Sequence, residues 1–199
     1  RRLSSAASDV YKRQHQMTAT SDQPSARTQR TLISVDAMGG DQGPAIVVAG
    51  CSASALKNPD ISFILHGPAE ALEPLVAKRP ELKGRCTIRD AQGVVTMDDK
   101  PSNVVRNGKG TSMWSAIESV RDNEASVAVS CGNTGALMAL SMIRLKKLPG
   151  VNRPAIAVLY PSTNPQGFNV LLDVGADVRA DADDLLRYAL MGKSYARNG

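Results

Sequence analysis

Short apolar runs alternate with longer segments of helical spacing from residue 31 to the end of the chain. The runs are rich in β-branched residues and show no strict alternation of apolar and polar positions, which predicts strands at 31–35, 61–66, 85–89, 126–130, 155–160 and 168–173. Helices are predicted between them, at 45–57, 69–78, 112–123, 134–147 and 182–197. The Gly- and Asp-rich segment 91–111 is expected to be irregular. Strands of this kind, separated by helices, indicate an α/β fold whose parallel sheet is covered on both faces.

Residues 1–30 show neither the strand period nor the helix period, and they are rich in Ser, Thr, Arg and Gln. They hold no apolar stretch of the kind that a secretory signal needs. The composition fits either an organellar transit peptide or a translated cloning adaptor joined to a natural start near Met17, and we favour the adaptor. We therefore expect a disordered tail at 1–30 and a folded part at 31–199.

Charge and cysteine content narrow the class of protein. The formal charge is +5, but residues 1–30 hold six Lys and Arg against two Asp, and the remainder holds 18 basic against 17 acidic residues. A nearly neutral body gives no argument for a nucleic-acid partner. The sequence contains no run of 18 apolar residues, which is the length that a membrane-spanning helix needs. The three cysteines, without a C-x-x-C pair, indicate buried thiols in a reducing, cytoplasmic compartment, with no disulfide framework and no metal site.

The first candidate loop follows the strand at 31–35. It reads DAMGGDQGP and combines the carboxylates of Asp36 and Asp41 with Gly39 and Gly40. Glycine permits close backbone approach and positive φ, so such a loop can border a ligand. The loop does not match G-x-G-x-x-G, and it lacks the lysine of a P-loop. A simple glycine turn with a capping Asp is the alternative.

The second candidate loop joins the strand at 126–130 to a predicted helix. It contains Ser130, Gly132, Asn133, Thr134 and Gly135. Free N–H groups at the start of a helix, together with the helix dipole, form an anion site, and the Asn and Thr side chains can add donors. The loop therefore predicts phosphate binding. Alternatively, Asn133 is only the N-cap of the helix.

Further candidates lie elsewhere in the chain. Asp173 ends a predicted strand and Gly175 allows a sharp turn after it, although both could be ordinary turn residues. Arg106 and Lys109 could balance the charge of a bound dianion, and solvated surface charge explains them equally well. The basic run 144–153 could receive an acidic partner.

Four segments in order resemble the bacterial phosphate acyltransferases of phospholipid synthesis. They read VDAMGGDQGP (35–44), SCGNTGALM (130–138), NRPAI (152–156) and LLDVGADV (171–178). The resemblance implies a three-layer α/β/α fold with a mostly parallel sheet, like that of isopropylmalate dehydrogenases and phosphotransacetylases. It also implies transfer of a long acyl chain from acyl carrier protein to inorganic phosphate, which gives an acyl phosphate. The family continues beyond residue 199, so we expect this chain to be its N-terminal part.

The resemblance also shapes what we expect of the site. It implies a homodimer when the protein is full length, peripheral contact with the inner membrane face, and no cofactor or metal. Within it, we assign catalytic roles to Asp36, Asp41 and Asn133. The other residues of the candidate loops and the two cations are assigned to substrate binding: Gly39, Gly40, Ser130, Gly132, Thr134, Gly135, Arg106, Lys109, Asp173 and Gly175. Two alternatives stay open: a metal-dependent decarboxylating dehydrogenase of the same fold, and an inactive binding fragment.

Overall fold

The computed structural model describes residues 30–147, 149, 151, 154–174 and 180–198, and the elements below refer to these residues. The chain divides into two units, 1–30 and 31–199. The expected disordered tail lies outside the described residues. The second unit holds the strands and helices in this order: β1 (Thr31–Asp36), α2 (Pro44–Lys57), β2 (Ile61–Gly67), α3 (Ala69–Ala77), a 3₁₀ turn (Pro80–Leu82), β3 (Cys86–Asp90), α4 (Pro101–Asn107), α5 (Ser112–Arg121), β4 (Val127–Ser130), α6 (Thr134–Arg144), β5 (Ala157–Pro161), β6 (Phe168–Leu172) and α7 (Ala182–Asn198).

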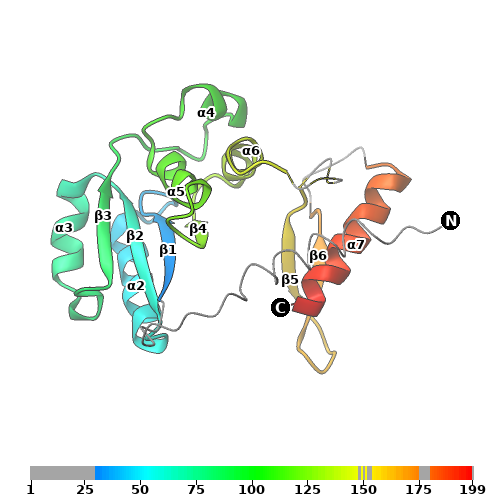
Figure 1. Cartoon of the computed structure of the whole chain (residues 1–199), viewed down its shortest axis with the longest axis horizontal. Coiled ribbons are helices and arrows are strands. Elements are labelled where there is room, and N and C mark those ends of the chain that lie inside the picture. Colours follow the sequence, from blue (N-terminus) through cyan, green and yellow to red (C-terminus); the bar gives the residue numbers. More distant parts are fainter. Residues whose placement is uncertain (1–29, 148, 150, 152–153, 175–179, 199) are drawn as a thin grey trace, which may run out of the picture. The chain divides into compact units, whose positions relative to one another are not determined.

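The first four strands form a parallel sheet in the order β3-β2-β1-β4 (Figure 1). Val35 of β1 pairs with Leu65 of β2 on one side and with Val129 of β4 on the other. On one face, Val35 and Leu65 pack with Val48 of α2 and Leu72 of α3. Helix α5 covers the other face, and α4 and α6 pack against α5 and each other. The prediction of a parallel sheet in a three-layer α/β/α arrangement is confirmed.

The face of the sheet under α5 carries a buried polar network around His66, which is 0% exposed. The Ser34 hydroxyl donates to the carbonyl of Ala116 at 2.9 Å, so the same oxygen accepts from His66 Nε2 at 2.8 Å. The other ring nitrogen, Nδ1, then accepts from the Ser115 hydroxyl at 2.8 Å. Burial first, and the nearby Arg89 guanidinium second, lower the pKa of His66 from 6.5 to about 4. The network therefore holds a neutral imidazole.

Two helices differ from the prediction. The segment 91–111 was expected to be irregular, yet it contains α4, which begins with Pro101 at its first position and buries Val104. Helix α6 ends at Arg144 rather than at residue 147. Lys146 has a positive φ of 65°, and a left-handed residue just after the last turn ends an α-helix.

The last two strands do not extend the parallel sheet. β5 and β6 form an antiparallel two-stranded sheet in which Leu159 pairs with Val170. The connection between them is short and contains Gly167 with a φ of 80°. Antiparallel strands can be joined by a tight turn, whereas parallel strands need a crossover of a dozen or more residues. These two strands are therefore the antiparallel part of a fold whose larger sheet is parallel, which agrees with the expected mostly parallel arrangement. Helix α7 packs against β6.

Candidate functional site

The loops that follow β1 and β4 meet at the carboxyl end of the sheet. The two strands are neighbours, and Asp36 pairs with Ser130 in their register. The Ser130 hydroxyl donates to Asp36 Oδ2 at 2.7 Å, and Ser130 Oγ accepts from the N–H of Gly132 at 3.1 Å. The Asp36 side chain also accepts from the N–H of Met38 at 3.3 Å, and Asp36 is only 2% exposed. Asp36 therefore fixes the start of both loops.

Two glycines allow this close approach. A Cβ on Gly39 would lie 2.7 Å from Asp36 Oδ2, 2.8 Å from the nitrogen of Gly132 and 2.8 Å from Ser130 Oγ. Real Cβ atoms do not come so close to backbone and short polar side chains. Gly40 has a φ of 100°, and its Cβ would lie 3.2 Å from the carbonyl oxygen of Cys131. Glycine at these two positions therefore allows the β1 loop to approach the backbone of the β4 loop closely, while their assignment to substrate binding stays a prediction.

Asn133 is the N-cap of α6, and its side chain is fully engaged. Its Oδ1 accepts from the N–H of Ala136 at 3.0 Å, which is the capping interaction. Its Nδ2 donates to the carbonyl oxygens of Thr96, Met97 and Asp99 at 3.2, 3.1 and 2.9 Å. Asn133 thus joins the β4 loop to residues 96–99. No pattern in the sequence indicates these last contacts, which link positions more than thirty residues apart.

Two backbone donors remain open at the start of α6. The capping of Ala136 leaves the N–H groups of Thr134 and Gly135 in the first helical turn, and neither has a partner among the described residues. Thr134 is exposed and carries a hydroxyl beside its N–H. The dipole of α6 adds partial positive charge at this point. Thr134 and Gly135 can therefore bind an anion together.

The turn at residues 96–99 is a third segment of the candidate site, held to the β4 loop by Asn133. It was not predicted from the sequence. The Asp99 carboxylate accepts from the N–H of Thr96 at 2.8 Å and from its hydroxyl at 2.9 Å. These hydrogen bonds lower the pKa of Asp99. The signal in the sequence is the pair of a Thr and an Asp three positions apart, which forms a local side-chain turn. The next residues begin α4, where Pro101 lies 3.0 Å from the position of a Cβ on Gly135.

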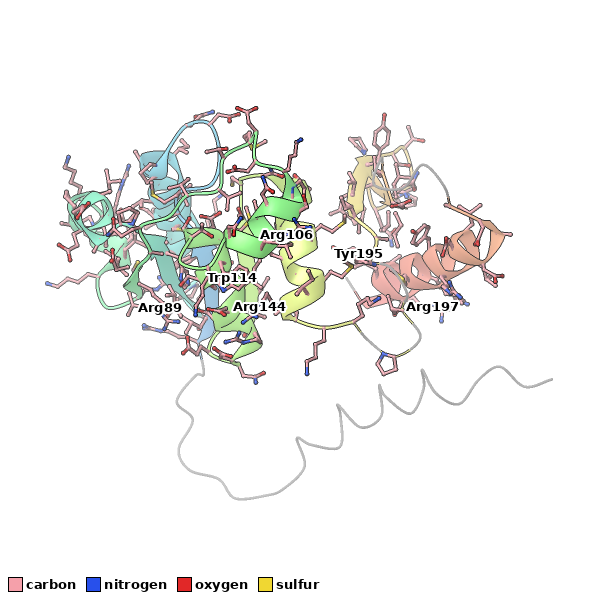
Figure 2. The ribbon with its side chains drawn as sticks, turned by 90° about the horizontal axis from the view of Figure 1, so that it is seen from above. Arg89, Arg106, Trp114, Arg144, Tyr195 and Arg197 are labelled. Carbon is pink, nitrogen blue, oxygen red and sulfur yellow. The ribbon has the colours of Figure 1, made fainter. Side chains whose placement is uncertain are left out.

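Other predicted site residues lie apart from this centre. Asp41 is exposed in the loop after β1. Within the described chain, its side chain forms no hydrogen bond to Ser130 or Asn133. Arg106 is exposed on α4 (Figure 2), and Lys109 is exposed in the loop after it. Asp173 ends β6 with a φ of 61°, and its Oδ1 is buried without a hydrogen-bond partner among the described residues. Gly175 lies outside the described residues.

The basic run 144–153 contributes less free charge than its composition indicates. Arg144 donates to Glu118 at 2.5 Å, and its guanidinium lies over the ring of Trp114, 4.8 Å from the centroid (Figure 2). Arg144 is thus committed to the packing of α6 on α5. Arg153 lies outside the described residues.

The three cysteines are free, but they are not all buried as predicted. Cys51 is buried, Cys86 is half-buried and Cys131 is exposed, because it lies in the loop after the edge strand β4. Among the residues that the structure describes, no group of three or more His, Cys, Asp or Glu side chains is placed to hold a metal ion. Within that same part of the chain, none of the helices is long and apolar enough to cross a bilayer.

The fold and the loops define an α/β protein with a candidate anion site at the carboxyl end of a parallel sheet. Residues 31–198 match the family described as fatty acid synthesis protein. The chain therefore belongs to this family, and the resemblance read from its motifs is confirmed.

Named relatives agree with the family match. The chain is 76% identical over 183 residues to the phosphate acyltransferase of Roseobacter denitrificans, covering 92% of this chain and 51% of that protein. It is also 76% identical over 168 residues to the phosphate acyltransferase of Paracoccus denitrificans, covering 84% of this chain and 45% of that protein. The chain spans about half the length of the curated relatives it matches.

Proposed function

We propose that this chain is part of an acyltransferase that moves a long acyl group from acyl carrier protein to inorganic phosphate. The observation that carries the proposal is the pair of open N–H donors at Thr134 and Gly135, beside two interlocked loops. Membership in a fatty acid synthesis family and relatives named phosphate acyltransferase support it. The decarboxylating dehydrogenase and the inactive fragment stay alternatives, and neither has an observation of its own in its favour.

The reaction needs positioning and charge stabilisation more than it needs a strong base. An oxygen of hydrogenphosphate attacks the thioester carbonyl, and a tetrahedral oxyanion forms. The carbon–sulfur bond then breaks, and the phosphopantetheine thiolate takes up the proton that the phosphate loses. The products are an acyl phosphate and the free thiol. Fixed donors that meet the developing charge lower the barrier without reorganisation.

Each predicted residue has a role in this proposal. Thr134 and Gly135 bind the phosphate oxygens. Asp36 and Ser130 hold the β4 loop, so Asp36 acts by positioning rather than by attracting an anion. Asn133 likewise acts by positioning, because it caps the start of α6. Asp41, which is exposed, is the carboxylate that can receive a proton from phosphate or face the thiol arm.

The remaining assignments concern partners and location. Arg106 and Lys109 are proposed to balance the charge of phosphate. Asp173 and Gly175 are proposed to lie near the substrate. Acyl carrier protein and inorganic phosphate are the partners. The full-length protein is proposed to be a cytoplasmic homodimer with peripheral contact at the inner membrane face.

The test removes one donor at a time from the full-length enzyme. Thr134→Ala deletes the hydroxyl, and Thr134→Pro deletes the hydroxyl and the N–H. Proline is tolerated at the first helical position, and Asn133 before it, with a ψ of 106°, already lies outside the α region that a following proline disfavours. A hydrogen bond to a charged group contributes about 1.5–3 kcal/mol. The Michaelis constant for phosphate should therefore rise roughly tenfold or more in the proline variant.

Mass spectrometry of the acyl phosphate formed from acyl carrier protein and phosphate gives the rates. Thr134→Ser, which keeps both donors, is the matched control and should behave as the parent enzyme. An unchanged Michaelis constant for phosphate in Thr134→Pro, with an unchanged melting temperature, would remove α6 from the phosphate site.

A further inference from the structure

An apolar groove lies on the face of the sheet that α2 covers, beside the edge strand β4. Its cavity volume is about 320 Å³, within the range of small-molecule pockets. The walls are almost entirely aliphatic and aromatic: Ile33, Val35, Ile46, Val47, Phe63 and Val129. Three polar residues of the lining lie where β1 and β4 end, at Asp36, Ser130 and Cys131, and Ser54 of α2 is a further one.

The groove exposes large apolar side chains that a protein surface rarely leaves uncovered. Val129 on β4 is 43% exposed, and Ile46 on α2 is 54% exposed. Helix α2 covers β1 and β2, but β4 is the edge strand, and its outer part on this face has no helix over it within the described chain. A contiguous apolar surface beside a polar site marks a place where an apolar group binds.

The groove is continuous with the candidate site. Ser130 and Cys131 line its end, and the same two residues begin the loop that leads to the open donors at Thr134. From this end, the groove runs back along β1 to Ile33, about 10 Å at 3.3 Å per residue. A chain that entered at Cys131 would therefore lie along the strands, with its first atoms next to the loops.

We propose that this groove binds the acyl chain of the substrate, with the carbonyl carbon at Ser130 and Cys131 and the methyl end toward Ile33. This inference rests on the proposed function, which supplies an acyl group and a phosphate to the same loops. An acyl chain fits because Ser54 is the one hydroxyl-bearing side chain among the lining residues below the loops and the walls are otherwise apolar, so a hydrocarbon can lie there without losing hydrogen bonds to water.

Gly50 offers a way to shorten the groove. It lies on α2 in the groove wall, and a Cβ built on it meets no heavy atom within 4 Å. Gly50→Phe therefore places a ring in the groove without a backbone clash. Ala53→Phe is the matched control, because Ala53 is exposed on the same helix and does not line the groove.

The experiment uses the full-length enzyme with palmitoyl and octanoyl acyl carrier proteins. In Gly50→Phe, the ratio of kcat/KM for palmitoyl over octanoyl substrate should fall at least tenfold, since loss of space for even one methylene costs about tenfold or more. The Michaelis constant for phosphate should stay unchanged. Ala53→Phe should keep the parent ratio.

An unchanged ratio in a folded Gly50→Phe enzyme overturns the inference and indicates that another part of the full-length polypeptide fills the groove. A second measurement needs no variant. An octanoyl chain, whose extended length matches the groove, with a photoreactive diazirine near its methyl end should crosslink to Ile33, Ile46 or Phe63 of the parent enzyme, and labelling confined to other residues overturns the inference. A parent enzyme that forms no acyl phosphate contradicts the proposed function instead.

Discussion

Acidification from pH 6.5 to pH 4 should remove about 3 kcal/mol of folding stability through His66 alone. The folded protein lowers the pKa of this imidazole from 6.5 to about 4, because the ring is buried and lies near Arg89. Each unit of pKa corresponds to about 1.36 kcal/mol. Between these two values the unfolded chain binds more protons than the folded protein does, so stability rises with pH. The contribution is complete above pH 6.5, is lost as pH falls toward 4, and is constant below that.

Urea unfolding between pH 4 and pH 7, followed by the fluorescence of Trp114, measures the effect. His66→Gln keeps a donor and an acceptor for the two serines but does not titrate. The pH dependence of its unfolding free energy therefore contains the contributions of all the other titratable groups and none from His66. The parent chain should lose about 3 kcal/mol more than His66→Gln over this window. Ser115→Ala serves as a control that should lower stability by about 1 kcal/mol at each pH and keep the slope.

The comparison between variants is decisive because other acidic and basic groups cancel in it. Equal slopes for the parent and His66→Gln would refute the reasoning, and would mean that the folded protein accepts a charged imidazole next to Ser34. A slope of the opposite sign would mean that a carboxylate stabilises the charged ring.

Three further predictions use the same unfolding assay or simple labelling. Gly39→Ala should lower the free energy of unfolding by about 1–3 kcal/mol, because the new Cβ would lie 2.7 to 2.8 Å from three polar atoms. Gly50→Ala should instead raise the free energy of unfolding by up to about 1 kcal/mol, because a Cβ there meets open space. Equal effects of the two substitutions would contradict the close approach of Gly39 to the β4 loop. Asn133→Ala should cost about 1–2 kcal/mol more than Asn133→Ser, which keeps a capping oxygen but loses the same three contacts to carbonyl groups, so equal losses would deny Asn133 a capping role. Iodoacetamide should label exposed Cys131 well before Cys51, since burial raises the pKa of Cys51 to about 12, and peptide mass spectrometry giving the reverse order would refute this.

Local signals in the sequence predicted the elements of the parallel sheet closely. The run at 31–35 became β1, and Pro44 marks the first turn of α2, as a proline at the start of a helix does. The helix α4 was missed because seven residues between glycine-rich segments give too little periodicity. The antiparallel hairpin of β5 and β6 was missed although its short connection was visible in the sequence.

The candidate site was predicted less completely than the fold. The glycine-rich loops stood out because glycine and asparagine after a strand are unusual. That the loops interlock through Gly39 could not be read from sequence, since it depends on which strand lies next to β1. The three carbonyl groups bound by Asn133 were hidden for the same reason. The structure thus brings the two predicted loops together into one candidate site, and the side chain of Asp41 forms no hydrogen bond to either loop within the described chain.

The hydrogen bond between Ser130 and Asp36 spans 94 positions in the sequence. β1 and β2 can pair early during folding, but β4 can reach β1 only after the chain between them is made and folded back. Long-range parallel pairing is slow because the entropy of loop closure opposes it until the contacts form. During synthesis, the donors at the start of α6 therefore come into place only after residue 136 is available and β4 has docked. Chains that end before that point should therefore lack the assembled anion site.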